Sequence, residues 1–353
     1  MTQSLLSSDM PLHAQQRYRD NFARHLLGLT RHLQSQTMHT LLAEFGHEGL
    51  RLNFEPYIAL LGDTGSRLSD IADTLGVSRQ SANQTANAIE AAGYATRVAD
   101  PRDGRARLLV LTDAGQQLRH DGITVAAGLQ ANTNKLVTAK EFDSSVDTLT
   151  ELNLALKLPM PAASTEMSLQ GIELAGLLPR LAGYIEYRLM TLTAEKGHPG
   201  LRLSFGQVLT LLGPQGGSIQ RIANIQDVSK QAISAIAREL QELDYIRREV
   251  DPDDARQLVL KLTPRGEALI ADSVASVNTL ANEFTRLVGA VRFKTLCQTL
   301  ATCYRALGLE DDIFTRPESL NVRVLARQLR AQLGASGAQQ LAQLLVRPKT
   351  VNG

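Results

Sequence analysis

The sequence has two cysteines, a formal net charge of only +1 and no long apolar run in its 353 residues. No window approaches the roughly 18 uninterrupted apolar residues of a membrane helix. The opening Met-Thr-Gln-Ser lacks the basic region and apolar core of a secretion signal. These shortages predict a soluble cytoplasmic protein without a membrane partner. The small net charge does not indicate a nucleic-acid-binding protein, so such a function must rest on local patches.

The two cysteines, Cys297 and Cys303, are six residues apart. That spacing does not bring two side chains together on one helix face, so it disfavours an intrahelical disulfide. We expect both to be buried free thiols.

The sequence also lacks the usual signatures of an enzyme. It has no nucleotide-binding glycine loop after a strand, no metal-binding cluster and no nucleophile with a suitable base. Asp63-Thr64-Gly65 resembles the catalytic loop of aspartic proteases, but a dyad requires a second acid and the related segment 214–216 reads Pro-Gln-Gly. Along a helix, His25, His32 and His39 are about 10.5 Å apart in succession and cannot share one metal ion. We expect no catalysis, no cofactor and no metal.

The chain does contain an internal repeat. An offset of 151 residues aligns positions 46–115 with 197–266 without a gap, and 27 of these 70 positions are identical. The length and the 43% hydrophobic fraction also suit two domains. We infer a tandem duplication. Its predicted parts are a first unit at 12–157, a linker at 158–167, a second unit at 168–308 and a basic C-terminal helical extension at 309–353.

Most of each unit is predicted to be helical. In the first unit, leucines at helical spacing indicate a long leading helix around residues 26–41, and a shorter helix follows at 53–62. After the central part of the unit, Thr112 opens one long helix that continues to about residue 155.

The central part of the unit has helix-turn-helix geometry. Gly76-Val77 separates two short helices, 68–75 and 78–92, and Ser78 is suited to cap the second. Strands at 96–99 and 107–111 then form a hairpin with a charged tip. The predicted fold is mainly α with small β wings.

Two segments at this spacing, VSRQSANQTANAIEAAGY from residue 77 and DPRDGRARLLVLTDAG from residue 100, resemble the MarR family of bacterial winged-helix transcription regulators. The family's wing reads Asp-x-Arg-Asp-x-Arg before Leu-Thr-x-x-Gly, and Asp100, Arg102, Asp103 and Arg105 fill that pattern. The resemblance covers both units. It implies homodimers whose first and last helices interlace and whose subunits each place one winged helix on DNA.

One chain would here supply both halves of such a dimer, as two winged helix-turn-helix units on a shared, pseudo-two-fold symmetric helical platform. A homodimer must present the same surface twice, whereas two linked units can diverge. The linker makes their pairing intramolecular, at an effective concentration on the order of millimolar. We expect a monomer that acts as an asymmetric pseudo-dimer.

The helix that starts at Ser78 has the composition of a DNA reader. Its apolar side carries Ala82, Ala86 and Ile89. Amides can contact adenine edges in bidentate fashion, and arginine can contact guanine. The predicted DNA contacts of the first unit are Ser78, Arg79, Gln80, Asn83, Gln84, Asn87, Arg102 and Arg105. A merely solvated polar face is the alternative, although four amides without an acid are unusual there.

The equivalent helix of the second unit is a poorer reader. We expect it to bury Ile233, Ile236 and Leu240 and to expose Ala235 beside the polar residues. Residues 67–112 carry six basic and five acidic residues, whereas 218–263 carry seven and eight, so the first head is +1 and the second −1. Its predicted DNA contacts are Lys230, Gln231, Ser234, Arg238 and Arg256.

The two wing tips differ at one position. Asp103 and Arg105 recur as Asp254 and Arg256, which favours an ion pair that shapes the turn. Arg102, which the resemblance places at the minor groove, is replaced by Asp253, whose charge repels phosphate. We expect the second head to bind DNA weakly or to read a different half-site.

The loops GHEGLRL and GHPGLRL, at 46–52 and 197–203, lie between the leading helix and the reading head of each unit. The resemblance places small anionic or phenolic effectors nearby, so His47, Arg51, His198 and Arg202 are candidate effector contacts. A loop that caps helices explains the pattern equally simply.

The tail at 316–353 carries six basic residues and one acid. Leu325, Leu329 and Leu333 indicate a helix, which either docks onto the core or contacts DNA flanks or another chain.

The sequence thus predicts a DNA-binding transcriptional regulator, most simply a repressor released by a small aromatic or anionic effector. Its predicted partner is a double-stranded operator with an imperfect palindrome, whose half-sites lie about 34 Å apart. The alternative is a divergent ligand-sensing or protein-interaction module that no longer reads DNA.

Overall fold

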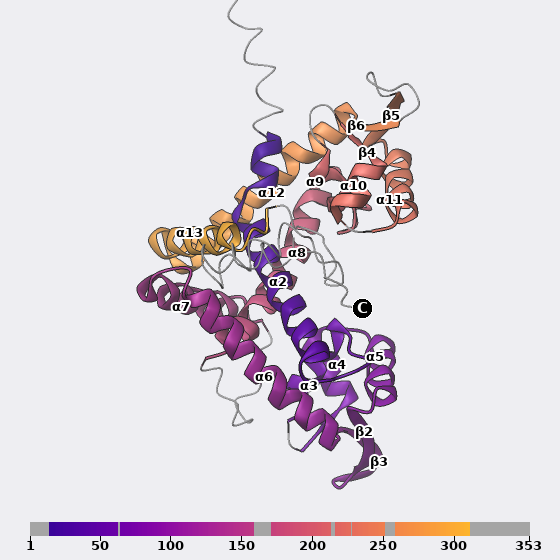
Figure 1. The fold of residues 1–353 in the computed structure, drawn as a ribbon, viewed down its shortest axis with the longest axis vertical. Helices are drawn as coiled ribbons and strands as arrows, with labels where there is room; N and C mark the ends of the chain where they lie inside the picture. Colours follow the sequence, from indigo (N-terminus) through magenta and orange to yellow (C-terminus); the bar gives the residue numbers. More distant parts are fainter. Residues whose placement is uncertain are drawn as a thin grey trace, which may run out of the picture.

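The computed structural model describes residues 14–62, 64–158, 171–212, 216–226, 228–250 and 258–310. Figure 1 shows two small heads at opposite ends of the longest axis, with a helical platform between them. Within the described ranges, no helix is both long enough and apolar enough to cross a membrane. The predicted C-terminal extension lies almost entirely outside them.

The platform is built by both halves of the chain. Its helices are α2 (Phe22–Ala43), α6 (Asp113–Asn134), α7 (Ala139–Ala155), α8 (Glu173–Glu195), α12 (Pro264–Val288) and α13 (Ala290–Ala306). One apolar core joins Leu29 of α2 and Leu152 of α7 with Leu181 of α8, Phe284 of α12 and Leu300 of α13. Burial of apolar side chains from both halves of the chain stabilises this core. The two halves therefore pack together at the platform.

The first head follows the predicted order of elements. It contains a 3-10 turn (Leu52–Phe54), α3 (Glu55–Leu61), β1 (Ser66–Arg67), α4 (Leu68–Leu75), α5 (Arg79–Ala91), β2 (Ala95–Asp100) and β3 (Asp103–Leu111). The antiparallel sheet has the order β1-β3-β2. Gly76 ends α4 with φ of 65°, which favours glycine, and thereby makes the predicted turn.

The second head repeats this arrangement around its own core. It contains α9 (Phe205–Leu211), β4 (Gly217–Ser218), α10 (Ile219–Gln226), α11 (Lys230–Glu242), β5 (Ile246–Val250) and β6 (Leu258–Leu262). The sheet order is β4-β6-β5. The mainly helical fold with two winged heads on a shared platform is as predicted.

The repeated Leu-Thr-x-x-Gly motif has a packing reason in both heads. Thr112 and Thr263 cap α6 and α12 by accepting the backbone N–H of Gly115 and Gly266. A Cβ on Gly115 would lie 1.9 Å from the Tyr94 carbonyl oxygen, and one on Gly266 would lie 2.0 Å from that of Tyr245. Any side chain at these two positions would collide with the backbone, so glycine is required for α6 and α12 to pack against Tyr94 and Tyr245.

Two predicted elements differ from the structure. The single helix from Thr112 to about residue 155 is two helices, because Thr138 and Glu141 form a capping box that starts α7. The predicted hairpin is part of a three-stranded sheet, since β1 pairs with β3 through Ser66 and Arg67. The spacing of apolar residues predicts neither feature, because the capping box and the pairing of β1 each depend on only two residues.

Candidate nucleic-acid interface and adjoining clefts

The recognition helix α5 presents the predicted polar face. Ser78 accepts the backbone N–H of Ser81 at 3.1 Å and so begins the helix. Ala82, Ala86 and Ile89 are fully buried in the head. The predicted reading residues are all exposed: Ser78, Arg79, Gln80, Asn83, Gln84 and Asn87.

Arg97 of β2 organises this face and was missed by sequence reasoning. Its guanidinium pairs with Glu90, donates to Asn87 Oδ1 at 2.9 Å and lies 3.5 Å from Asn83 Oδ1. The amide oxygen of Asn87 is thereby held, which leaves its NH₂ group as the donor for a base or phosphate. The available signal was the repeat itself, because Arg97 is identical to Arg248 in the alignment.

The first wing is shaped by Arg67 of β1. Its guanidinium lies 2.6 Å from Asp100 Oδ2 and 3.5 Å from Asp103 Oδ2. Asp100 also accepts the backbone N–H of Arg102 at 2.9 Å. That backbone hydrogen bond, together with the Arg67 guanidinium, lowers the pKa of the Asp100 carboxyl.

The predicted Asp103–Arg105 ion pair is wrong. Asp103 accepts the backbone N–H of Arg105 at 3.2 Å, and its side-chain partner is Arg67. Arg102 and Arg105 are exposed, and neither guanidinium has an ion pair among the residues the structure describes. The tip therefore offers two cations where one was expected.

The second recognition helix, α11, is less suited to reading. Ser229 begins it by accepting the N–H of Ala232 at 3.1 Å. Lys230, Gln231, Ala235 and Arg238 are exposed as predicted, but Ser234 is half-buried. Ile236 is also only half-buried, because Ala237 takes the fully buried position beside Ile233 and Leu240.

Three basic residues of the second head form ion pairs within it. Glu249 binds Arg247 at 2.5 Å and Lys261 at 2.9 Å, and Arg202 binds Glu239 at 2.8 Å. The position of Arg67 is Ser218 in this head, so the aligned position does not supply the guanidinium that contacts both aspartates of the first wing. The predicted wing residues Asp253, Asp254 and Arg256 lie outside the described residues.

The two predicted effector histidines are engaged in buried contacts. His47 Nε2 lies 2.8 Å from Asp121 Oδ2, and its ring packs against Tyr94, which donates to the Glu48 carbonyl at 2.9 Å. These contacts connect the loop at 46–51 to α6 and to Tyr94, which lies between the recognition helix and β2.

The second head repeats the arrangement. His198 Nε2 lies 3.0 Å from Asp272 Oδ2, and its Nδ1 lies 3.2 Å from the Tyr245 hydroxyl. Both histidines thus position the loop that carries Arg51 or Arg202.

Each of those arginines lines a cleft between a head and the platform. The first cleft, of about 200 Å³, lies between α2, α3, α6 and the start of α8. Its walls are mainly apolar, and its charged residues are Arg51, Arg119, Arg180 and Glu55. Desolvation by the surrounding protein raises the pKa of the Glu55 carboxyl, and the Arg180 guanidinium opposes that shift. The Glu55 side chain is nevertheless exposed.

The second cleft, of about 180 Å³, is the pseudo-symmetric counterpart between α8, α9, α12 and residues 18–31. Its charged residues are Arg24, Arg31, Arg202 and Glu186. Arg51 and Arg202 are equivalent residues of the two units. The other charged residues of each cleft have no charged residue at the equivalent position of the other unit.

Comparisons with known proteins agree with this architecture. The sequence profile described as MarR family matches residues 57–106 and 200–257. A Thauera aromatica protein named as a transcriptional regulatory protein for the hcr operon is 25% identical over 126 residues, which are 36% of this chain and 74% of that protein.

Solved structures with a likeness include CouR from Rhodococcus jostii RHA1 bound to p-coumaroyl-CoA, at 24% identity and a TM-score of 0.27 over 31% of this chain and 76% of CouR. YusO from Bacillus subtilis is 20% identical, with a TM-score of 0.33, over 39% of this chain and 95% of YusO. The two profile matches fall one on each head, at the elements described above. The MarR family profile therefore matches this single chain twice, once in each head, and the chain is similar to transcriptional regulators of that family.

Proposed function

We propose that the protein is a sequence-specific DNA-binding repressor in which one chain acts as an asymmetric pseudo-dimer. The observation that carries this proposal is the exposed amide-rich face of α5 beside two exposed wing arginines without ion pairs among the described residues. A good bidentate contact between an amide and adenine contributes about 1–3 kcal/mol of discrimination. Arg102 and Arg105 add salt-dependent contacts that hold the head on the duplex.

The two heads are proposed to bind unequally. The first head's wing aspartates both contact Arg67, whereas the second head has Ser218 at the equivalent position and carries one more acid than base. Lys230, Gln231, Ser234, Arg238 and Arg256 are the second head's proposed contacts. The operator that fits is an imperfect palindrome with half-sites about 34 Å apart.

We further propose that a small aromatic or anionic effector releases the DNA. CouR, one of the similar solved structures, was solved with p-coumaroyl-CoA, which is an aromatic anion. Arg51 and Arg202 line the two clefts at equivalent positions, and Arg51 of the first cleft is the proposed contact. His47 and His198 hold the loops that carry them, so they would transmit a movement of the loop to Tyr94 and Tyr245.

The alternative is a ligand-sensing or protein-interaction module without DNA binding, and the acidic second head favours it. A selection of genomic fragments with the purified full chain at about 50 mM and about 200 mM salt separates the two. A repressor enriches a shared motif that binds more weakly at the higher salt. The alternative predicts no enrichment at either salt concentration.

A further inference from the structure

Residues 17–25, here termed the brace, connect the platform to the second head. Arg19 Nε donates to the Thr210 carbonyl oxygen at 2.8 Å, and Arg24 Nη2 donates to the Thr210 hydroxyl at 2.9 Å. Thr210 lies in the last turn of α9 and is almost completely buried. A guanidinium there satisfies a helix carbonyl that has no partner within the helix and lies at the negative end of its dipole.

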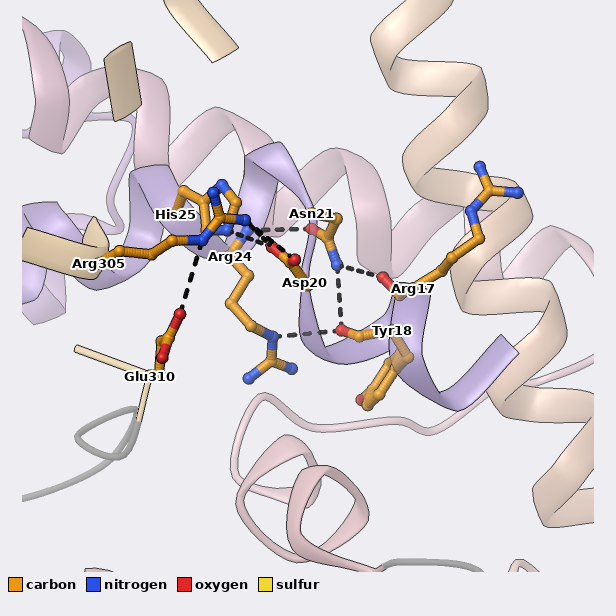
Figure 2. Close-up of polar contacts among 8 residues, drawn as sticks. All are labelled: Arg17, Tyr18, Asp20, Asn21, Arg24, His25, Arg305 and Glu310. Atoms are coloured by element: carbon orange, nitrogen blue, oxygen red, sulfur yellow. Dashed lines mark hydrogen bonds and ion pairs between the residues drawn. The ribbon is translucent and has the colours of Figure 1, made fainter. Parts of the chain in front are cut away.

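The other contacts of the brace fix it to the platform. Figure 2 shows Asp20 between His25, at 2.7 Å, and Arg305 of α13, at 3.1 Å. Arg17 donates to Asn278 of α12 at 2.9 Å. The second head is thus attached through residues of the first unit.

Arg24 and Tyr18 complete this attachment at the second cleft. Tyr18 packs on the second head's core, and the Arg24 guanidinium lies 5.4 Å from the Tyr18 ring centroid. Arg24 also donates to the Tyr18 carbonyl at 3.2 Å, as Figure 2 shows. Both side chains line the cleft, and Nε and Nη2 of Arg24 already donate to acceptors within the protein.

The first head has no equivalent attachment in its sequence. Asp20, Arg24 and His25 correspond to Gly171, Ala175 and Gly176 after the offset of 151, and Thr210 corresponds to Ala59. The carboxylate, guanidinium, imidazole and hydroxyl that form the brace are therefore absent at these positions.

The cations of the two clefts differ accordingly. In the second cleft, Arg24 binds Thr210, Arg31 lies 2.9 Å from Glu186, and Arg202 pairs with Glu239. In the first cleft, the Arg51 guanidinium has no hydrogen bond or ion pair within the described ranges. Arg180 donates to the Gly176 carbonyl, and burial lowers its pKa.

We propose that the first cleft binds one small amphipathic anion through Arg51 and Arg180, while the braced second cleft binds none. An anion that enters an apolar cleft with a partly desolvated guanidinium gains a charge-assisted hydrogen bond. The binding itself does not depend on DNA. Its regulatory consequence rests on the proposed repressor function: only the first head moves when the effector binds, and the second stays fixed.

The test is calorimetry and fluorescence titration of the full chain with 8-anilinonaphthalene-1-sulfonate, without DNA. We expect one site per chain. Ala126→Trp fills the first cleft and Val277→Trp fills the matched position of the second, 151 residues later. The first variant loses the site and the second keeps it, while Arg180→Leu weakens binding about tenfold or more. Circular dichroism establishes that each variant is folded.

A second measurement tests the brace directly. Hydrogen exchange of residues 205–211 is expected to accelerate in Arg24→Ala, while exchange of the matched residues 54–60 stays unchanged. No dye binding, two equal sites, loss of the site in Val277→Trp or unchanged exchange in Arg24→Ala would each overturn the inference. A chain with one dye site that ignores all duplexes would contradict only the proposed repressor function.

Discussion

The guanidinium of Arg67 lies 2.6 Å from the Asp100 carboxylate, and this contact determines which charges the first wing presents to solvent. Asp100 and Asp103 both lie against Arg67, whereas the guanidinium groups of Arg102 and Arg105 are exposed at the tip. Ser218 replaces Arg67 in the second head, and Asp253 replaces Arg102. The tip at 100–105 together with Arg67 therefore carries a formal charge of +1, whereas residues 251–256 together with Ser218 carry −2.

Exchange of the wing charges tests this asymmetry. Arg102→Asp is expected to weaken binding to the selected operator and to reduce the salt slope by about 1, because one phosphate contact is lost. Asp253→Arg is expected to strengthen binding. Fluorescence anisotropy over a salt series measures both. If neither variant changes affinity, electrostatics at the wings does not explain the difference between the heads.

A matched pair on the recognition helices tests direct readout. Gln80→Ala is expected to cost about 1–3 kcal/mol on the selected site and to relax the sequence preference there. Gln231→Ala, the equivalent position of the second head, is expected to cost less. Competition binding with single-base operator variants measures the preference. Equal losses in the two variants would indicate that both heads read DNA alike.

A third prediction concerns pH and the brace. Burial lowers the pKa of His25 below its ordinary value of 6.5, and the nearby cations Arg305 and Arg24 add to this shift, whereas Asp20 opposes it. The ring also packs against Tyr304. Because the unfolded chain binds this proton more readily, the free energy of unfolding is expected to fall as the pH decreases below 6.5.

His25→Gln should remove that part of the pH dependence. Urea unfolding at pH 7.5 and pH values below 6.5 measures it in both proteins. A variant with the same decrease in stability on acidification would show that other groups account for the pH dependence.

The cysteines give a fourth prediction. Both are free as predicted, but only Cys303 is buried, and Cys297 is half-buried. Desolvation by the surrounding protein raises the pKa of Cys297 to about 12 and that of Cys303 to about 11. At pH 8 the thiolate fractions are then about one in ten thousand and about one in a thousand, so both thiols should react slowly with iodoacetamide. Unfolding in urea should expose both. Rapid labelling of the folded protein would contradict this account.

Local signals made the recognition heads predictable from sequence. Ser78 and Gly76 act within one or two turns of their own helices, and the buried positions of α5 follow from a period of 3.6 residues. The internal repeat added an independent check, since each motif occurs twice.

Features that depend on contacts between distant segments were missed or wrong. The predicted Asp103–Arg105 ion pair does not form, because the Asp103 carboxylate contacts Arg67, which lies 36 residues earlier in the chain. Arg97 was overlooked because its contacts with Glu90 and Asn87 require the wing to fold against α5. The clefts and the brace exist only once the two halves pack together, so no local pattern could reveal them.

The central claim is that one chain binds one duplex through two heads of unequal affinity. Hydroxyl-radical footprinting of the selected operator, at a measured stoichiometry, tests it most directly. We predict one chain per duplex, with strong protection of one half-site and weak protection of the other. Two equally protected halves, or two chains per duplex, would contradict the claim.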